Sequence, residues 1–340
     1  MSNIYLYPKY DIRTATAPNP YMVNFEESLA KEHIIVNKSF NHRGVLDFFK
    51  YVFKADLFVL NWIENLSLRR RGKLQIIAFQ IFLIIAKLSG RRILWVLHNK
   101  YTHDTVKNRW TDLMFKVMMR SSDFILTHSN CGIDFVKENF PEYTSKVKYI
   151  AHPVKKVFLN NIKEEEKFDF LLWGVILPYK GILQFLMYVN DSSEMRSLRI
   201  LIVGKCLDSE YKTKINEYLS ENIIHLDRYY EIEQIAGFAK QAKFILFTYN
   251  PESILSSGSL MDSIGMGSVI IGPSAGAFKD LSTYSFVKTF NSYSEIIDIY
   301  KSFDKNKYSL NSEIDSFCQE NSWKLFVGKL FDEFIISSGD

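Results

Sequence analysis

Short runs of β-branched and aromatic residues alternate with longer segments of helical periodicity along most of this chain. Segments between the runs, such as NRWTDLMFKVMMRS (108–121), carry apolar residues at helical spacing. Strands that alternate with helices form right-handed βαβ units, so we predict a mostly parallel sheet with helices on both faces. The first six runs are NIYLY (3–7), HIIVN (33–37), DLFVLN (56–61), RILWVLH (92–98), DFILTH (123–128) and VKYI (147–150).

The alternation begins again after a polar stretch, KEEEKF (163–168), which we interpret as a linker. Five more runs follow: FDFLLWG (168–174), LRILIVG (198–204), NIIHL (222–226), KFILFT (243–248) and SVIIG (268–272). A chain of 340 residues exceeds what one core usually supports. We therefore predict an α/β protein of two doubly wound, Rossmann-like domains, 1–160 and 161–320, that face each other across a cleft. The amphipathic segment 321–340 is expected to be a helix that packs back on the first domain.

Composition and charge narrow the functional class. A net charge of +4 that is not concentrated in a tail gives no argument for nucleic acid as a partner. Three distant cysteines, Cys131, Cys206 and Cys318, favour neither a zinc ribbon nor a secreted disulfide scaffold. The first residues lack a basic segment followed by a long apolar one, so we expect a cytoplasmic protein.

The longest apolar stretch, LQIIAFQIFLIIAKLSG (74–90), is interrupted by polar residues and is shorter than the roughly 20 residues that cross a bilayer. We expect a buried helix here. Basic residues flank the stretch on both sides, in RRRGK (69–73) and at Arg91 and Arg92. This basic fringe predicts peripheral contact with an anionic membrane, at the inner face of the cell membrane.

Ligands of parallel α/β sheets bind beyond the carboxyl ends of the strands. Two residues at such positions suit a polar or anionic ligand. His98 can donate and accept hydrogen bonds, or else it is a capping or loop histidine. Lys180 precedes a predicted helix that starts at Gly181, where the ammonium and the helix N-terminus both favour an anion. The alternative for Lys180 is a solvated loop lysine.

The segment SILSSGSLMDSIGMGSVIIGPSAG (253–276) holds five of the chain's 15 glycines. It follows a predicted strand and should start a helix at residues 257–259, whose N–H and hydroxyl groups would converge on an anion. Asp262, about one turn later, could accept hydrogen bonds from sugar or ribose hydroxyls. Such a cradle suits a diphosphate. The alternative is a serine-capped helix packed closely through Gly265 and Gly267.

Other chemistries fit the sequence poorly. GPSAG (272–276) matches the G-x-S-x-G nucleophile elbow, but no histidine follows Ser274, as that hydrolase fold requires. The chain has no P-loop and no G-x-G-x-x-G dinucleotide motif. His98, His103 and Asp104 could hold a metal, but their spacing in a loop is weak evidence for a metal site, and we expect none.

Four motifs together resemble the GT-B glycosyltransferases, particularly the retaining, family-four-like enzymes of bacterial capsule and exopolysaccharide assembly. The motifs are NPY (19–21), WVLHN (95–99) with a further His-Asp at 103–104, YKG (179–181) and SILSSGSLMDSIGMGSVI (253–270). The resemblance spans nearly the whole chain. It implies a nucleoside diphosphate sugar as co-substrate in the C-terminal domain and a saccharide or lipid-linked saccharide acceptor in the N-terminal domain. It implies no metal and no other cofactor.

The resemblance also implies roles for individual residues. Lys180 pairs with the donor diphosphate, the serine-glycine loop contacts the phosphates, and Asp262 binds the ribose. The expected donor-binding residues are Gly174, Tyr179, Lys180, Gly181, Tyr249, Glu252, Ser256, Ser257, Gly258, Ser259 and Asp262. The expected acceptor-binding residues are Asn19, Tyr21, Asn61, Trp62, Asn99 and His103, and the expected catalytic residues are His98 and Lys180. Two features depart from the family: no arginine precedes Lys180, and Glu252 lies ten residues before Asp262 instead of forming the usual closer glutamate pair.

The function that follows is transfer of a hexose from a nucleoside diphosphate sugar to an acceptor hydroxyl in surface polysaccharide synthesis. A retaining outcome needs no dedicated base, whereas an inverting one would use His98, His103 or Asp104. A non-catalytic protein that binds a nucleotide sugar or serves as a scaffold in a polysaccharide assembly complex is the alternative.

Overall fold

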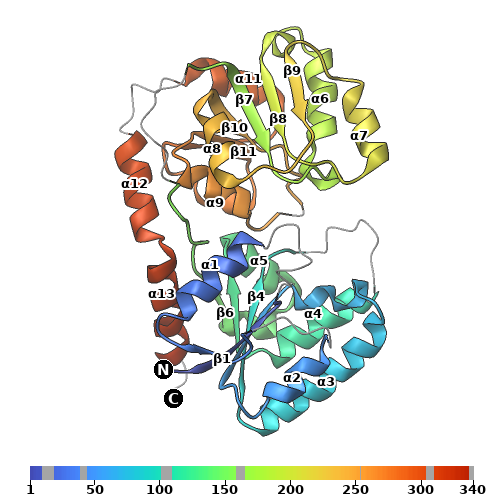
Figure 1. Ribbon diagram of the computed structural model, residues 1–340, viewed down its shortest axis with the longest axis vertical. Coiled ribbons are helices and arrows are strands. Elements are labelled where there is room, and N and C mark those ends of the chain that lie inside the picture. Colours follow the sequence, from blue (N-terminus) through green and yellow to red (C-terminus); the bar gives the residue numbers. More distant parts are fainter. Residues whose placement is uncertain are drawn as a thin grey trace. The chain divides into compact units, whose positions relative to one another are not determined.

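The computed structural model describes residues 1–9, 19–38, 44–100, 109–157, 165–252, 254–303 and 310–336 (Figure 1). The chain divides into two compact units: Met1–Ala151 with Trp323–Asp340, and His152–Ser322. The division after residue 151 differs from the expected boundary at 160. The described part of the expected linker, 165–168, therefore belongs to the second unit, whose first strand begins at Phe168.

In its described residues the first unit holds a parallel sheet of six strands, in the order β2-β1-β3-β4-β5-β6. The strands are β1 (Asn3–Tyr7), β2 (Ile34–Ile35), β3 (Leu57–Asn61), β4 (Arg92–Leu97), β5 (Phe124–Thr127) and β6 (Val147–Tyr149). The α-helices are α1 (Pro20–Leu29), α2 (Leu46–Tyr51), α3 (Gly72–Leu88), α4 (Arg109–Ser121), α5 (Asn130–Asn139) and α13 (Trp323–Ile336), and two 3-10 helices are η1 (Ile63–Leu68) and η2 (Pro141–Lys146).

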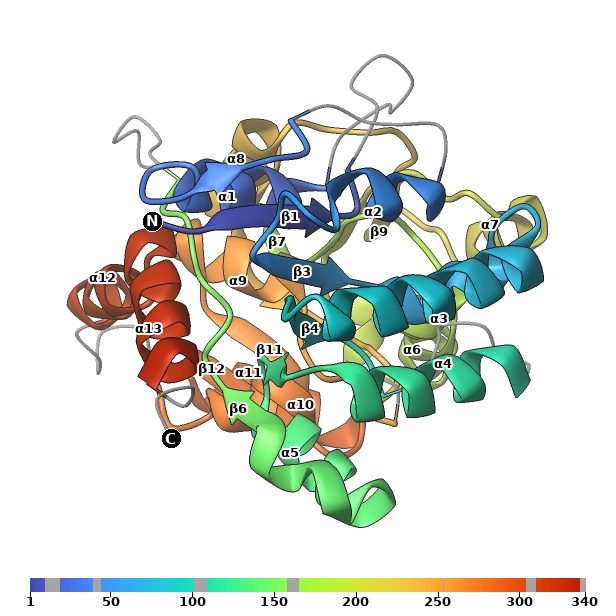
Figure 2. The same ribbon diagram turned by 90° about the horizontal axis from the view of Figure 1, so that it is seen from below.

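Both faces of this sheet are buried because successive side chains of a strand point to opposite sides. On β1, Ile4 and Leu6 pack in one cluster with α1 and α13. Tyr5 and Tyr7 point the other way, where their rings lie 4.9 and 5.3 Å from the ring of Phe48 on α2. Figures 1 and 2 show α1 and α13 on one side of the sheet and α2, α3 and α4 on the other.

Helix α3 corrects the expectation of a buried helix over 74–90. One face is buried, including Phe79 and Phe82, which are fully inaccessible. The other face exposes apolar side chains: Leu74, Ile77, Ile81, Ile84 and Leu88. None of the helices in the described ranges is both long enough and apolar enough to pass through a membrane.

The described residues of the second unit also form a parallel sheet of six strands, in the order β12-β11-β10-β7-β8-β9. The strands are β7 (Phe168–Trp173), β8 (Ile200–Val203), β9 (Ile223–Leu226), β10 (Ala242–Leu246), β11 (Ile270–Pro273) and β12 (Val287–Phe290). The α-helices are α6 (Ile182–Asp191), α7 (Ser209–Asn216), α8 (Ile232–Lys240), α9 (Gly258–Gly265), α10 (Gly276–Asp280), α11 (Ser294–Ser302) and α12 (Leu310–Glu320), with 3-10 helices η3 (Pro178–Lys180) and η4 (Met195–Ser197).

The predicted fold class, two parallel α/β sheets, is confirmed. Sequence analysis identified every strand of both sheets except β12. This strand lies at the edge of its sheet, and its central residues, Lys288 and Thr289, are only partly buried. An edge strand of this kind lacks the continuous apolar run that marks a buried strand.

Close packing fixes the position of α9. A Cβ atom at Gly265 would lie 2.3 Å from the backbone carbonyl oxygen of Lys155. The amide of Val157 also donates to the Gly265 carbonyl at 2.9 Å. The first segment of the second unit therefore lies directly against the C-terminal end of α9.

We expect Gly265→Ala to lower the free energy of unfolding by about 1–3 kcal/mol, because the added methyl group overpacks a contact with backbone atoms. Gly237→Ala is the matched control, since a Cβ there meets nothing within 4 Å in the middle of α8. It should raise stability by about 0.5–1 kcal/mol through helix propensity. Denaturant unfolding of both variants measures the two effects, and a stabilised Gly265→Ala protein would contradict the packing described here.

Candidate functional site

The strand order of the second unit places a topological switch point between β7 and β10. Strands β8 and β9 lie on one side of this pair and β11 and β12 on the other. In open parallel sheets, ligands bind at the carboxyl ends of the strands next to such a point. The chain leaves β7 at Gly174 and continues past β10 through Thr248 and Tyr249, so the loops around these residues form the donor-side candidate site.

Lys180 is the central cation of this site. Only 5% of the residue is exposed, which excludes the solvated loop lysine considered from the sequence. Its Nζ donates to the Trp173 carbonyl at 3.3 Å and lies 5.6 Å from the ring centre of Tyr249. Within the described ranges, no carboxylate forms an ion pair with it. Burial lowers the pKa of the ammonium, and neighbouring Tyr179 opposes that shift.

Two glycines allow this geometry. Gly174 has φ +100°, and a Cβ atom there would lie 2.7 Å from Lys180 Nζ and 3.5 Å from Ser259 Oγ. Gly181 has φ +68°, and its Cβ would lie 2.2 Å from the Thr248 carbonyl oxygen. Both positions require a left-handed backbone, which glycine adopts without a steric cost. The side chains of Lys180 and Ser259 thus approach the same small space beside Gly174.

Backbone and side-chain hydrogen bonds join the loop after β7 to the loop after β10. Thr248 Oγ1 donates to the Lys180 carbonyl at 2.7 Å, and the Asn250 amide donates to the Tyr179 carbonyl at 3.1 Å. The rings of Tyr179 and Tyr249 meet edge to face at 5.9 Å. These contacts hold Lys180 in a fixed position beside the switch point.

The N-terminus of α9 supplies the second part of the site. Ser257 caps the helix by accepting a hydrogen bond from the Leu260 amide, so the capping role weighed from the sequence is confirmed for this residue. Its Oγ also lies 3.5 Å from the hydroxyl of Tyr249. Ser256 Oγ is buried and has no hydrogen-bond partner among the described residues. A buried hydroxyl without a partner is unfavourable, and an anionic ligand at the helix N-terminus would provide one.

The five glycines of the segment 253–276 serve different purposes. Gly265 makes a close backbone contact, Gly272 faces the ring of Phe278, and Gly267 and Gly276 have positive φ. Only Gly258, the first residue of α9, is exposed in a position where a Cβ meets nothing within 4 Å and no positive φ is needed. Gly258 is therefore the glycine of this segment that the fold does not require.

Asp262 lies on α9 one turn after Gly258. It is partly buried, and burial raises the pKa of its carboxyl from 3.8 to about 7, against the opposing effect of Lys155. Glu252, the other acidic residue expected in the donor site, is exposed, and its amide donates to Asn250 Oδ1 at 3.1 Å. The two acidic side chains thus lie in different environments.

The first unit has its own switch point, between β1 and β3. Asn61, fully buried at the end of β3, spans this point because its Nδ2 donates to the Tyr7 carbonyl at 3.0 Å. Its Oδ1 is then the acceptor for His98 Nε2 at 2.9 Å, which places the proton on that ring nitrogen. His98 is 7% exposed and stacks on Trp62 with ring centres 4.2 Å apart. It is a fixed strand-end histidine and not a solvated loop residue.

Trp62 has φ +50°, a left-handed conformation that is rare and strained for a large side chain. Tyr21 packs edge to face against both Trp62 and His98, at 6.1 and 5.1 Å. The hydroxyl of Tyr21 contacts His128 Nε2 at 3.0 Å, while His128 Nδ1 contacts the Ile150 carbonyl at 2.9 Å. A carbonyl only accepts, so Nδ1 carries the proton and Nε2 accepts from Tyr21.

The remaining acceptor-side predictions have simpler outcomes. Asn19 caps α1, since its Oδ1 accepts from the Tyr21 amide at 3.0 Å. Asn99 is partly exposed directly after His98. His103 and Asp104 lie outside the described residues. Within the described ranges, no group of three or more His, Cys, Asp or Glu side chains is arranged to hold a metal ion.

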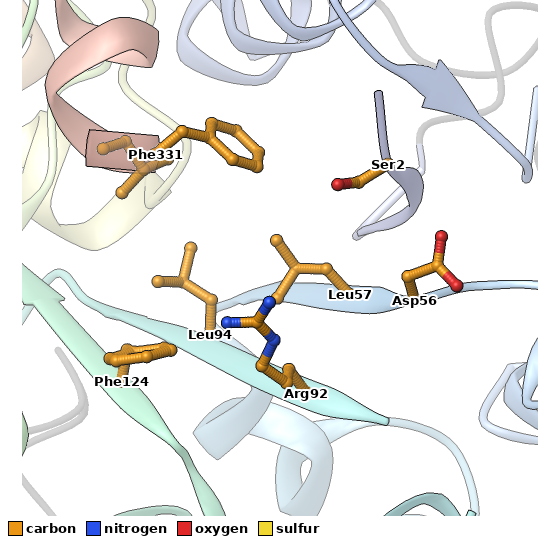
Figure 3. Close-up of a pocket in the computed structure, with 8 residues that line it drawn as sticks. Ser2, Asp56, Leu57, Arg92, Leu94, Phe124 and Phe331 are labelled. Atoms are coloured by element: carbon orange, nitrogen blue, oxygen red, sulfur yellow. The ribbon is translucent and has the colours of Figure 1, made fainter. Parts of the chain in front are cut away.

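A cavity of about 50 Å³ lies at the opposite edge of the first sheet (Figure 3). It opens at the amino ends of the strands and beside α13, away from Asn61 and His98. Its lining residues are Ser2, Asp56, Leu57, Arg92, Leu94, Phe124, Leu330 and Phe331. Because ligands of parallel sheets bind at the carboxyl ends, we do not assign this cavity to the candidate site.

The comparisons with known proteins agree with this architecture. No family model and no curated protein matches the sequence. Among solved structures, HepE from Anabaena in complex with UDP and glucose superposes with a TM-score of 0.70 at 13% identity, over 99% of this chain and 100% of that one. A glycosyltransferase from Rickettsia africae gives 0.64 at 14% identity, over 100% and 99% of the two chains. AviGT4, a glycosyltransferase involved in avilamycin A biosynthesis, gives 0.64 at 10% identity over the same shares.

The fold is that of the GT-B glycosyltransferases. At these sequence identities the similarity establishes the fold only. The chemistry has to be inferred from the residues of the candidate site. Three residues of the two candidate sites were not singled out from the sequence: Trp173, Ser263 and His128. Trp173 Nε1 donates to Ser263 Oγ at 2.9 Å, and Ser263 Oγ donates to the Ser259 carbonyl at 2.7 Å. His128 stands at the end of the predicted strand 123–128, a position that could have identified it.

The raised pKa of Asp262 predicts a dependence of stability on pH. The unfolded chain releases this proton near pH 4, whereas the folded chain keeps it until about pH 7. Stability therefore falls as the pH rises through this window and levels off above it. Asp262→Asn lacks the effect, so its melting temperature relative to the wild type should increase from about pH 4 to about pH 8.

Asp298→Asn, at an exposed position on α11, is the control for loss of one negative charge. Thermal unfolding of the three proteins at several pH values measures the difference. A constant offset between Asp262→Asn and the wild type across the window would show that the Asp262 carboxyl is not desolvated.

Proposed function

We propose that the protein is a glycosyltransferase that moves a hexose from a nucleoside diphosphate sugar to a hydroxyl of a saccharide or lipid-linked saccharide acceptor in surface polysaccharide synthesis. One observation carries the proposal: a buried lysine without a carboxylate partner in the described chain lies beside the open N-terminus of α9, at the switch point of a GT-B sheet. A diphosphate would be an anionic partner for Lys180 and would accept hydrogen bonds from the helix N-terminus.

The main barrier in the reaction is the separation of an anionic diphosphate from an oxocarbenium-like sugar. As the bond from the anomeric carbon to the phosphate oxygen breaks, negative charge grows on the leaving group. The Lys180 ammonium and the N–H groups of residues 257–259 stabilise this charge in a site that burial has already desolvated. Preorganised electrostatic stabilisation of this kind is often the largest contribution to catalysis.

On the acceptor side, Asn61 and Trp62 hold His98 in one orientation, so His98 can position the sugar or the acceptor hydroxyl. We propose a retaining reaction without a metal, in which the acceptor oxygen bonds to the anomeric carbon and its proton passes to the departing phosphate. Asp262 is proposed to bind the ribose hydroxyls. Uridine nucleotides are the first donors to test, since the fold neighbour HepE is described in complex with UDP-glucose.

The experiment has two stages. Melting temperatures with UDP-, GDP-, ADP- and dTDP-sugars identify the nucleotide, because a ligand that binds only the folded state stabilises it. Release of nucleoside diphosphate from the best donor is then measured with and without saccharide acceptors. Stabilisation without release under any acceptor condition would favour the non-catalytic binding or scaffold protein, and no stabilisation by any donor would reject the proposal.

Lys180→Met tests the diphosphate contact directly. We expect affinity for the nucleoside diphosphate to fall by about 1.5–3 kcal/mol, roughly ten- to 150-fold, as for loss of a hydrogen bond to a charged group. The melting temperature of the free protein should stay the same or rise, because a buried ammonium that no carboxylate of the described chain neutralises is replaced by an apolar chain of similar length. Calorimetry and thermal unfolding measure the two quantities.

The control for this variant is Lys214→Met, which removes the same charge from an exposed position on α7 where Lys214 pairs with Glu210. Nucleotide affinity should be unchanged in this protein. Equal affinities of Lys180→Met and the wild type would overturn the assignment of Lys180.

Gly258→Val separates binding from folding at the start of α9. A Cβ atom at this exposed position meets nothing within 4 Å, so the melting temperature should change little. The side chain would intrude where the ligand approaches, and we expect at least a tenfold loss of nucleotide affinity, about 1.4 kcal/mol.

Gly267→Val should show the reverse pattern, since Gly267 has φ +81° and lies after the end of α9. A β-branched residue is strained in that conformation, so stability should fall while affinity is kept. A large melting shift with normal affinity in Gly258→Val would mean that residue 258 serves only the fold.

A further inference from the structure

Helix α3 carries an apolar stripe that no described part of the chain covers. The α3 stripe consists of Leu74, Ile77, Ile81, Ile84 and Leu88, which are 64, 54, 50, 61 and 84% exposed. Their spacing alternates between three and four residues, which keeps them on one narrow face along the whole helix. A contiguous apolar face of this length on a water-exposed surface marks an interaction site.

The opposite face of α3 is committed to the core of the first unit. Ile76, Phe79, Phe82, Leu83 and Ala86 are at most 3% exposed. The helix of 17 residues is about 25 Å long, less than the roughly 30 Å of a bilayer's hydrocarbon layer. Whatever covers the α3 stripe must therefore lie against the helix side-on.

The surface around the stripe is strongly basic, although the chain as a whole carries only +4. Helices α2 and α4 pack against α3, and both views show α4 running alongside it (Figures 1 and 2). The exposed or partly exposed basic residues of these helices and their flanks are Lys50, Lys54, Arg69, Arg70, Arg71, Lys73, Lys87, Arg91, Arg92, Arg109, Lys116 and Arg120. Over 44–56, 63–92 and 109–121, Asp56 and Asp112 are the exposed acidic residues, and Asp56 already pairs with Arg91.

This charge pattern discriminates between occupants of the stripe. Lys73 and Lys87 border it, and α3 itself contains no acidic residue. A second copy of the chain on this face would bring two basic surfaces together. An anionic bilayer instead offers negative headgroups to the basic residues and acyl chains to the stripe.

We propose that the α3 stripe and its basic surroundings dock the first unit onto an anionic membrane surface, with α3 lying in the plane of the headgroups. The basic segment 69–71 directly precedes α3 at the edge of the sheet where β3 ends, and the Arg69 guanidinium lies 5.4 Å from the ring centre of Tyr7. The carbonyl of Tyr7 is the one that holds Asn61. Docking thus brings the acceptor side of the first unit to the level of lipid headgroups, where a lipid-linked acceptor would present its sugar.

The test is co-sedimentation of the full chain with phosphatidylcholine vesicles, with and without about 30% phosphatidylglycerol, at low and high salt. The wild type should bind the anionic vesicles at low salt and bind the neutral ones at least tenfold more weakly. Ile77→Gln/Ile81→Gln/Ile84→Gln should reduce binding to anionic vesicles at least tenfold. Arg69→Gln/Arg70→Gln/Arg71→Gln should weaken binding at low salt and flatten its salt dependence.

The matched control is Met187→Gln/Leu207→Gln/Ile224→Gln, which changes three exposed apolar residues of the second unit and should bind like the wild type. Melting temperatures confirm that each variant is folded. No donor is present, so the outcome is independent of the transfer assay. Equal binding by the wild type and the isoleucine variant would overturn the proposal. So would a wild-type dimer that the isoleucine substitutions dissociate and that does not bind vesicles, because a second copy would then cover the stripe.

Discussion

The contact of the Lys180 ammonium with the end of β7 is the interaction on which the candidate site of the second unit depends. It requires a glycine at 174 to leave room for Nζ, a glycine at 181 to bring the lysine loop against Thr248, and the hydrogen bonds that join the two loops. A buried cation without a carboxylate partner in the described chain is costly, and the fold bears this cost where a GT-B sheet exposes its switch point. The α9 N-terminus then adds donors that point to the same region.

The first unit also has its switch point held by hydrogen bonds, but with neutral groups in place of a cation. Its switch point is closed by an amide, since Asn61 bonds the Tyr7 carbonyl and orients His98 at the same time. Around it, the rings of Tyr21, Trp62 and His98 form a rigid aromatic group. The candidate site of the second unit thus concentrates positive charge, whereas that of the first unit offers oriented neutral groups. This division suits the proposed reaction between a charged leaving group and an uncharged hydroxyl.

Much of the fold could be predicted because alternation between strand and helix patterns is local. The position of Lys180 beside a helix start and the cap at Ser257 also follow from short motifs. What sequence alone did not reveal depends on contacts between distant segments. Ser263 contributes to the site because Trp173 donates a hydrogen bond to it. Which face of α3 is exposed depends on which face packs into the core. Strand β12 is stabilised by pairing with β11 and not by an apolar run of its own.

The stacking of Trp62 on His98 is accompanied by backbone strain at Trp62. Glycine or asparagine adopts a backbone φ of +50° at lower steric cost, yet the chain has tryptophan, the largest side chain, at this position. The indole of Trp62 stacks on the imidazole of His98, so the strained backbone at Trp62 accompanies the alignment of His98. Selection for thermostability alone would favour replacement of Trp62 by a residue that tolerates this backbone conformation, and such a replacement would remove the ring that aligns His98.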